Sequence, residues 1–165
     1  MNNNINAEEI LQIAITIEEN GQEFYSMALK SFTNPAIRDQ IESLAVWEDG
    51  HIERLKELLR EIDNADDEFP IFSSPEEDSS LYIKSIGDEH IFVQDGSIDD
   101  VIKECKTVED ILRLALRFER DSVKFYKSVA GQAICEDTKK TLFTIMDEEQ
   151  THVSQIEKLL DLELN

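Results

Sequence analysis

Residues 44–51 read LAVWEDGH, and residues 145–152 read IMDEEQTH. Both stretches carry a Glu-x-x-His motif among apolar residues at helical spacing, and the two copies lie 101 residues apart. One such motif is a weak signal, because surface pairs and helix-stabilising contacts often produce it. Two copies at one offset, each inside a stripe of apolar residues, indicate a shared role. The motif residues are Glu48 and His51 in the first copy and Glu149 and His152 in the second.

The same offset of 101 extends upstream of both motifs, where it aligns Glu18 with Glu119 and Tyr25 with Tyr126. A chain of 165 residues is short enough to form a single domain. The sequence therefore predicts an all-α fold, a four-helix bundle made of two helical hairpins with one long connection. We expect one domain over residues 1–165, with a hairpin at 7–62, a crossover at 63–106 and a second hairpin at 107–163.

Capping residues and helix breakers place the helix boundaries. Asn6 with Glu9 and Thr107 with Asp110 have the spacing of a capping residue and its partner. Only 5 Gly and 3 Pro occur, which leaves long uninterrupted helical stretches. The Asn34-Pro35 pair, the strongest start signal, puts proline at the first helical position. The predicted helices run from 7 to about 29, from 35 to 62, from 107 to 131 and from 136 to 162, with two weaker helices in the crossover at 81–92 and 97–105.

The charge of the chain excludes several classes of partner. With 16 Lys and Arg against 37 Asp and Glu, the formal net charge is −21. Nucleic acids and anionic membrane surfaces bind mainly through Lys and Arg, so we expect neither as a partner. No apolar run approaches the roughly 18 residues that a membrane-spanning helix needs. Cys105 and Cys135 form no CxxC motif, and a soluble, cytoplasmic protein with reduced thiols is the expectation.

The apolar stripe of each predicted helix contains a carboxylate at its middle. Uncompensated charges in an apolar interior cost several kcal/mol or become protonated, whereas bound divalent metals remove that cost. The alternative is a buried polar network without metal, for which the stripes offer few partners. Carboxylate and imidazole ligands without thiolate favour iron or manganese over zinc. The predicted metal ligands are Glu18, Glu48, His51, Glu119, Glu149 and His152.

Helical spacing also predicts how these ligands are divided between two metal ions. Residues at i and i+3 share a helix face, so Glu48 with His51 would hold one ion and Glu149 with His152 the other. Glu18 and Glu119 would then complete or bridge the pair, and either could shift between bridging and terminal positions.

Two tyrosines, a tryptophan and two further glutamates lie close to the predicted ligands in the sequence. Tyr25 and Tyr126 follow Glu18 and Glu119 by two turns, where they would either hydrogen-bond to ligand carboxylates or pack in the core. Trp47 is expected to pack or to form an interface. Glu19 and Glu148 fall outside the apolar stripes, so we expect them in solvent.

The ligand pattern resembles the ferritin-like di-iron carboxylate proteins, in which two helices give one Glu each and two give Glu-x-x-His. Residues 18–25 (EENGQEFY) and 119–126 (ERDSVKFY) look most like rubrerythrin-type domains, and the likeness covers about residues 9–62 and 107–162. Two departures stand out. Ser122 lies where these proteins commonly have a further carboxylate, and the chain shows no C-terminal rubredoxin module.

The resemblance implies a ferritin-like fold around two iron ions, with manganese or zinc as substitutes. It implies an oxidoreductase that reduces peroxide or dioxygen with electrons from a separate donor protein, and a homodimer. Two alternatives stay open at this stage: a ferroxidase and iron-storage protein, which needs a large closed assembly, and a non-catalytic metal-binding interaction module.

Overall fold

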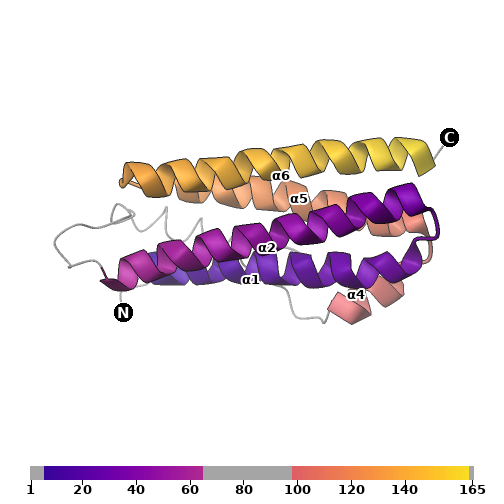
Figure 1. Ribbon diagram of the computed structural model, residues 1–165, viewed down its shortest axis with the longest axis horizontal. Coiled ribbons are helices and arrows are strands. Elements are labelled where there is room, and N and C mark those ends of the chain that lie inside the picture. The colour runs from indigo at the N-terminus through magenta and orange to yellow at the C-terminus, as the bar shows by residue number, and fades with distance from the viewer. Residues whose placement is uncertain (1–5, 65–97, 164–165) are drawn as a thin grey trace.

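The fold is seen in a computed structural model that describes residues 6–64 and 98–163. These residues form an all-α bundle, as predicted (Figure 1). A 3-10 turn, η1, follows the first long helix, and a short helix, α4, precedes the third. The long helices are α1 (Ala7–Ala28), α2 (Pro35–Asn64), α5 (Val108–Ala130) and α6 (Glu136–Glu163); the short elements are η1 (Leu29–Ser31) and α4 (Ile98–Glu104).

The helices begin where the capping signals predict. At the start of α1, Asn6 accepts a hydrogen bond from the Glu9 amide, and the Glu9 side chain accepts one from the Asn6 amide. Thr107 and Asp110 repeat this reciprocal arrangement at the start of α5. Each of these capping boxes gives hydrogen-bond acceptors to two backbone amides that the first helical turn leaves without partners. The short helix predicted at 97–105 is observed as α4, and the one predicted at 81–92 lies outside the described residues.

The long helices pair as two hairpins, α1 with α2 and α5 with α6 (Figure 1). Arg38 stabilises the connection between α1 and α2. Its guanidinium donates hydrogen bonds to the carbonyls of Leu29 at 3.0 Å and Phe32 at 3.2 Å. The α4 helix packs against α1. The hairpins then face each other, so that the middle of every long helix contributes to one shared interior.

The two hairpins approach each other closely where α1 meets α5. A Cβ atom added at Gly21 would lie 2.3 Å from Cζ of Phe118, far inside van der Waals contact. The Phe118 ring, fully buried, therefore fills space that only glycine leaves free. A shared apolar core of Ile, Leu, Phe and Ala side chains continues from this point along the bundle.

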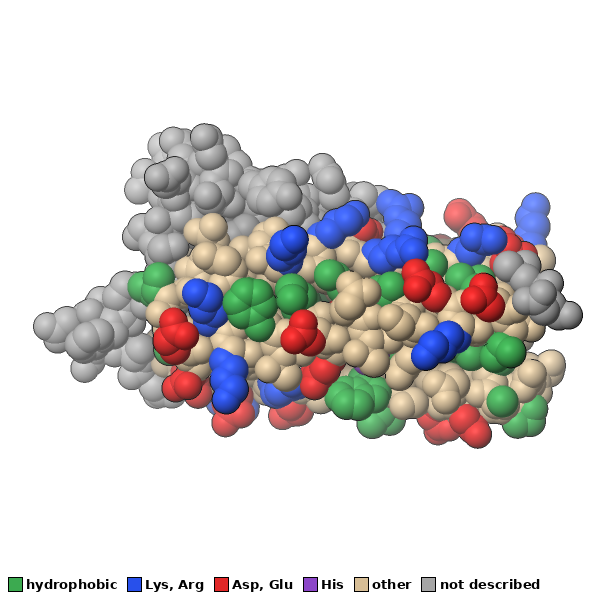
Figure 2. All heavy atoms as spheres, turned by 90° about the horizontal axis from the view of Figure 1, so that it is seen from above, with side chains coloured by type: hydrophobic (Ala, Val, Ile, Leu, Met, Phe, Trp, Pro, Cys, Tyr) green, Lys and Arg blue, Asp and Glu red, His purple; other side chains and the backbone are tan. Residues whose placement is uncertain are grey.

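The surface is mixed in character. Figure 2 shows acidic and basic side chains interspersed with separate hydrophobic ones on one face of the bundle. Among the large apolar side chains, Trp47 is 44% exposed and Phe143 38%. Within the part of the chain that the structure describes, no helix is both long enough and apolar enough to cross a membrane.

Candidate metal centre

All six predicted ligand residues lie together in the middle of the bundle. Each is fully buried except His152, which is 2% exposed. The α1 and α5 helices contribute one glutamate each, and α2 and α6 contribute one Glu-x-x-His motif each. These residues are Glu18 on α1, Glu48 and His51 on α2, Glu119 on α5, and Glu149 and His152 on α6.

The six side chains form two overlapping groups that could each hold one metal ion. In each group, one ligand atom from every residue lies within 4.8 Å of the others. Glu48 and Glu149 belong to both groups, so they are placed to bridge two ions. One group is Glu18, Glu48, His51 and Glu149, and the other is Glu48, Glu119, Glu149 and His152.

The shared residues refine the expectation drawn from spacing. The sequence left Glu18 and Glu119 to complete or to bridge the pair. In the structure each of them belongs to one group only, where it completes a half-site. The residues common to both groups are instead Glu48 and Glu149 of the Glu-x-x-His motifs, because α2 and α6 bring these two side chains to the centre of the cluster.

Both histidines direct Nδ1 into the carboxylates. From His51 Nδ1, the distances are 2.6 Å to Glu149 Oε1, 3.0 Å to Glu18 Oε2 and 3.6 Å to Glu48 Oε2. His152 Nδ1 lies 3.2 Å from Glu149 Oε2 and 3.5 Å from Glu119 Oε2. The two rings stack with their centroids 5.6 Å apart. The two stacked imidazoles therefore both face the carboxylate cluster with their Nδ1 atoms.

Several carboxylate oxygens in this cluster make no hydrogen bond of normal geometry among the described residues, although imidazole nitrogens lie near some of them. They are both oxygens of Glu48, Oε2 of Glu119 and Oε1 of Glu149. Buried polar atoms are normally paired, and an unpaired carboxylate is especially costly to bury. Four carboxylates would balance the charge of two divalent cations, and the oxygen and imidazole donors suit iron or manganese. The residues present therefore fit a dinuclear metal centre, and neither cysteine belongs to either group.

Without metal, protons must balance the charge. Burial and the neighbouring Glu149 raise the pKa of Glu48 well above its usual range, and the same two causes raise the pKa of Glu119. Burial alone would lower the pKa of His152, but hydrogen bonds with Glu119 and Glu149 outweigh it and raise this pKa to about 10. His51 shifts in the same direction for the same kind of reason. Burial would also raise the pKa of Glu149, yet its hydrogen bonds lower it.

Two tyrosines contact candidate ligand carboxylates on the opposite hairpin. The Tyr25 hydroxyl on α1 donates to Glu119 on α5, and the Tyr126 hydroxyl on α5 donates to Glu18 on α1. Burial is the main cause that raises the pKa of both phenols, so both remain protonated donors. Both rings also pack edge-on against the preceding phenylalanine, so hydrogen bonding and core packing occur together.

One contact of the site was not predicted. Glu148 was expected in solvent, yet its side chain is only 25% exposed and its Oε2 lies 3.1 Å from His51 Nε2. It also pairs with Arg54 of α2. The expectation was wrong because the sequence does not show how α6 is rotated against α2. Glu19, by contrast, has a side chain that is 51% exposed and pairs with Lys56.

The fold and this centre define a class of protein, a four-helix bundle with a buried carboxylate and imidazole cluster. Comparison with protein families gives a more specific result. The model of the ferritin-like domain matches residues 6–162, and the chain belongs to this family. No curated protein matches the chain.

Two solved structures share the fold across nearly the whole chain. A hypothetical protein from Pyrococcus furiosus is 20% identical with a TM-score of 0.68, covering 96% of this chain and 90% of its own. A Thermotoga maritima protein, provisionally described as a ferritin-like diiron-carboxylate protein, is 21% identical with a TM-score of 0.65, covering 96% of both chains. At this level of identity the likeness establishes the fold alone.

Proposed function

We propose that this protein is a di-iron oxidoreductase of rubrerythrin type that reduces peroxide or dioxygen with electrons from a separate donor protein. The observation that carries the proposal is the pair of overlapping ligand groups that share Glu48 and Glu149. The description of the Thermotoga maritima protein as a diiron-carboxylate protein gives further support. Iron, when bound, would supply reversible electron transfer to the oxidant.

The proposed roles of the ligands follow from their places in the two groups. Glu18 and His51 would complete one half-site, and Glu119 and His152 would complete the other. Glu48 and Glu149 would bridge them. The four carboxylates together balance two divalent charges, so the buried cluster would be close to neutral when both half-sites are filled.

The surrounding residues keep this ligand set in place. The hydroxyls of Tyr25 and Tyr126 each fix one oxygen of a glutamate, which limits how far that carboxylate rotates. Ser122 is fully buried on α5, at the position where rubrerythrin-type domains commonly have a further carboxylate. We therefore propose a centre that works with six ligands and without movement of a metal to a seventh.

The proposal is tested by reconstitution with ferrous iron under anaerobic conditions, followed by separate mixing with peroxide and with dioxygen. We expect two irons per chain, and consumption of one oxidant that continues as long as a reductant is supplied. Glu48→Gln removes a bridging carboxylate and should abolish both iron binding and turnover. Glu53→Gln, an exposed position on the same helix, is the matched control and should change neither.

Three results would overturn parts of the proposal. Iron binding that is unchanged in Glu48→Gln would refute the site. Two bound irons without accelerated consumption of either oxidant would refute the reaction and favour a non-catalytic metal-binding module. Iron that accumulates far beyond two per chain in a large assembly would favour storage.

A further inference from the structure

The two copies of the internal repeat have identical residues at the ligand positions and different residues in contact with the two histidines. Every ligand has an identical counterpart 101 residues away, whereas the residue before each bridging glutamate differs, being Trp47 in the first copy and Glu148 in the second. Because α2 faces α6 across the bundle, each of these side chains reaches the histidine of the other copy. The two halves of the candidate centre therefore have different surroundings.

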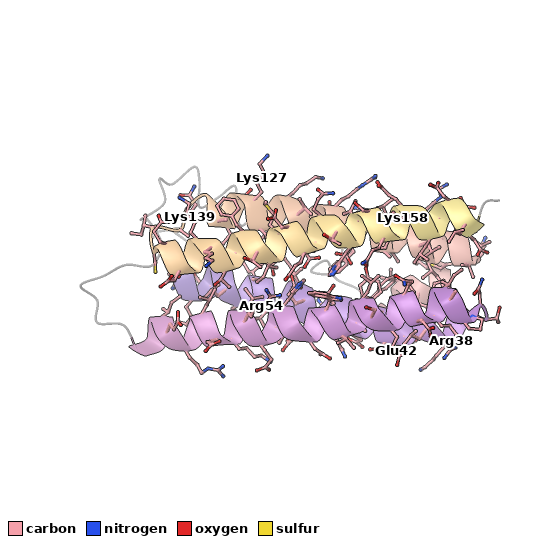
Figure 3. The ribbon with its side chains drawn as sticks, turned by 45° about the horizontal axis from the view of Figure 1, so that its top comes forward. Arg38, Glu42, Arg54, Lys127, Lys139 and Lys158 are labelled. Carbon is pink, nitrogen blue, oxygen red and sulfur yellow. The ribbon has the colours of Figure 1, made fainter. Side chains whose placement is uncertain are left out.

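On one side, the remote nitrogen of His51 meets a carboxylate. Its Nε2 lies 3.1 Å from Glu148 Oε2, while its Nδ1 faces the ligand cluster. Arg54 also pairs with Glu148 and lies between the α2 and α6 ribbons (Figure 3). Three side chains thus form one chain of contacts from the bundle surface to the centre, and the imidazole orientation is set from both of its nitrogens.

On the other side, the ring of His152 meets an indole. The Trp47 and His152 ring centroids are 6.0 Å apart with an interplanar angle of 64°, an edge-on contact. All the carboxylate contacts of His152 within the described residues involve Nδ1. An indole offers a hydrogen-bond donor and no in-plane acceptor, so Trp47 cannot do for His152 what Glu148 does for His51.

This difference affects how well each histidine binds metal. An imidazole that donates its remote N–H to a carboxylate is fixed in tautomer and orientation, and it is a stronger ligand through its other nitrogen. Loss of such a partner typically lowers metal affinity about 10-fold to 100-fold. The neighbouring Arg54 offsets the charge of Glu148, so the effect depends on the directed hydrogen bond more than on net charge.

We propose that the two half-sites bind a divalent metal with unequal affinity, that the half-site of Glu18 and His51 fills first, and that Glu148 is the positioning residue responsible. This inference rests on the metal centre proposed above. It assigns a role to a residue that is not itself a ligand, and it predicts an order of filling that the identical ligands of the repeat would not produce.

The test uses the metal-free full chain and Co²⁺, a divalent probe that dioxygen does not oxidise during the titration. Calorimetry should resolve two binding steps whose affinities differ by about 10-fold to 100-fold. Crystals grown with one equivalent of Co²⁺ should show the stronger anomalous peak beside His51 and the weaker one beside His152. Equal peaks in the parent protein would overturn the inference.

Variants identify the cause of the preference. Glu148→Ala should lower the affinity of the first step about 10-fold or more and make the two peaks equal, and Glu148→Gln, which keeps an acceptor, should restore part of the preference. Glu19→Ala is the matched control, because Glu19 also adjoins a ligand glutamate but contacts Lys56 on the surface. A preference that survives in Glu148→Ala would refute the assignment.

The outcomes also separate this inference from the proposed function. Absence of Co²⁺ binding would refute the metal centre itself. Two ions bound with equal affinity would refute only the unequal half-sites. Circular dichroism of each variant establishes that its helices are intact. Arg54→Gln provides a second route, since it removes the ion pair that helps to hold Glu148 beside His51 and should reduce the preference while leaving every ligand in place.

Discussion

The Tyr126 hydroxyl of α5 donates a hydrogen bond to the Glu18 carboxylate of α1. The two residues come from different hairpins and are separated by most of the chain, yet both are fully buried. The reciprocal contact of Tyr25 with Glu119 makes the same connection in the opposite direction. Two hydrogen bonds thus join the hairpins at the candidate centre.

Tyr126→Phe should weaken this connection. The substitution keeps the ring and removes the hydrogen bond that Oε1 of Glu18 accepts from the phenol. A buried acceptor left without its donor costs about 1–3 kcal/mol. We expect the free energy of unfolding of the metal-free protein, measured by urea denaturation, to fall by about this amount. Tyr25→Phe should behave alike, and an unchanged midpoint in both variants would contradict a structural role for these contacts.

Removal of a shared and of an unshared glutamate should have different effects on metal content. Glu149 belongs to both ligand groups and Glu119 to one. Glu119→Ala should therefore leave the other half-site able to bind, with about one iron per chain, whereas Glu149→Ala should lose nearly all bound iron. Metal analysis after anaerobic loading measures this. Equal losses in the two variants would argue against the bridging role.

Metal binding should release protons and should strengthen as the pH rises. In the metal-free protein the raised pKa of His152, about 10, keeps its imidazole protonated at neutral pH, and His51 behaves in the same way. A metal ion must displace these protons before the nitrogens can coordinate it. Calorimetry at pH 7 in buffers of different ionisation enthalpy should detect at least two protons released per two metals. A pH-independent affinity between 6 and 9 would contradict this.

The same shifts fix how the stability of the metal-free protein depends on pH. The folded pKa of His152, about 10, exceeds the unfolded value of about 6.5. Its contribution to stability is therefore fully present below pH 6.5 and is lost as the pH rises through about 10. The raised pKa of Glu48 acts in the same direction. We expect the Tm of the metal-free protein to fall between pH 6.5 and 10, and bound metal to suppress the fall.

Two glycines in the long helices should respond oppositely to alanine. At Gly21 a Cβ would lie 2.3 Å from Cζ of Phe118, so Gly21→Ala must displace a buried ring and should destabilise the protein by about 1–3 kcal/mol. At Gly50 nothing lies within 4 Å, and Gly50→Ala should stabilise α2 by about 0.5–1 kcal/mol. Denaturation midpoints measure both. Stabilisation in both variants would contradict the close approach of α1 and α5.

The helix starts of this bundle can be predicted from local sequence because they depend on residues within the first helical turn. Asn6 and Thr107 form the capping boxes that their spacing predicts, and Pro35 begins α2. The six candidate ligands were found through the repeat, since a polar residue that recurs inside two apolar stripes must be accommodated in the core. In the structure all six meet at one place.

The remaining features depend on how the helices are oriented against each other. Which glutamates are shared follows from the approach of α2 to α6, and no spacing within one helix encodes it. Glu148 was misplaced for the same reason, because its position outside the apolar stripe indicates solvent until α2 is brought beside it. The crossed partners of Tyr25 and Tyr126 likewise appear only once the two hairpins are paired.

Both hairpins belong to a single polypeptide, and this has a consequence for what the centre can become. A cluster assembled from two copies of one short chain would carry every substitution twice, so its halves would stay identical. Here a change at position 148 leaves position 47 untouched, and a carboxylate on one side coexists with an indole on the other. Covalent joining of the two hairpins thus allows substitutions to change the surroundings of one candidate metal position without changing those of the other.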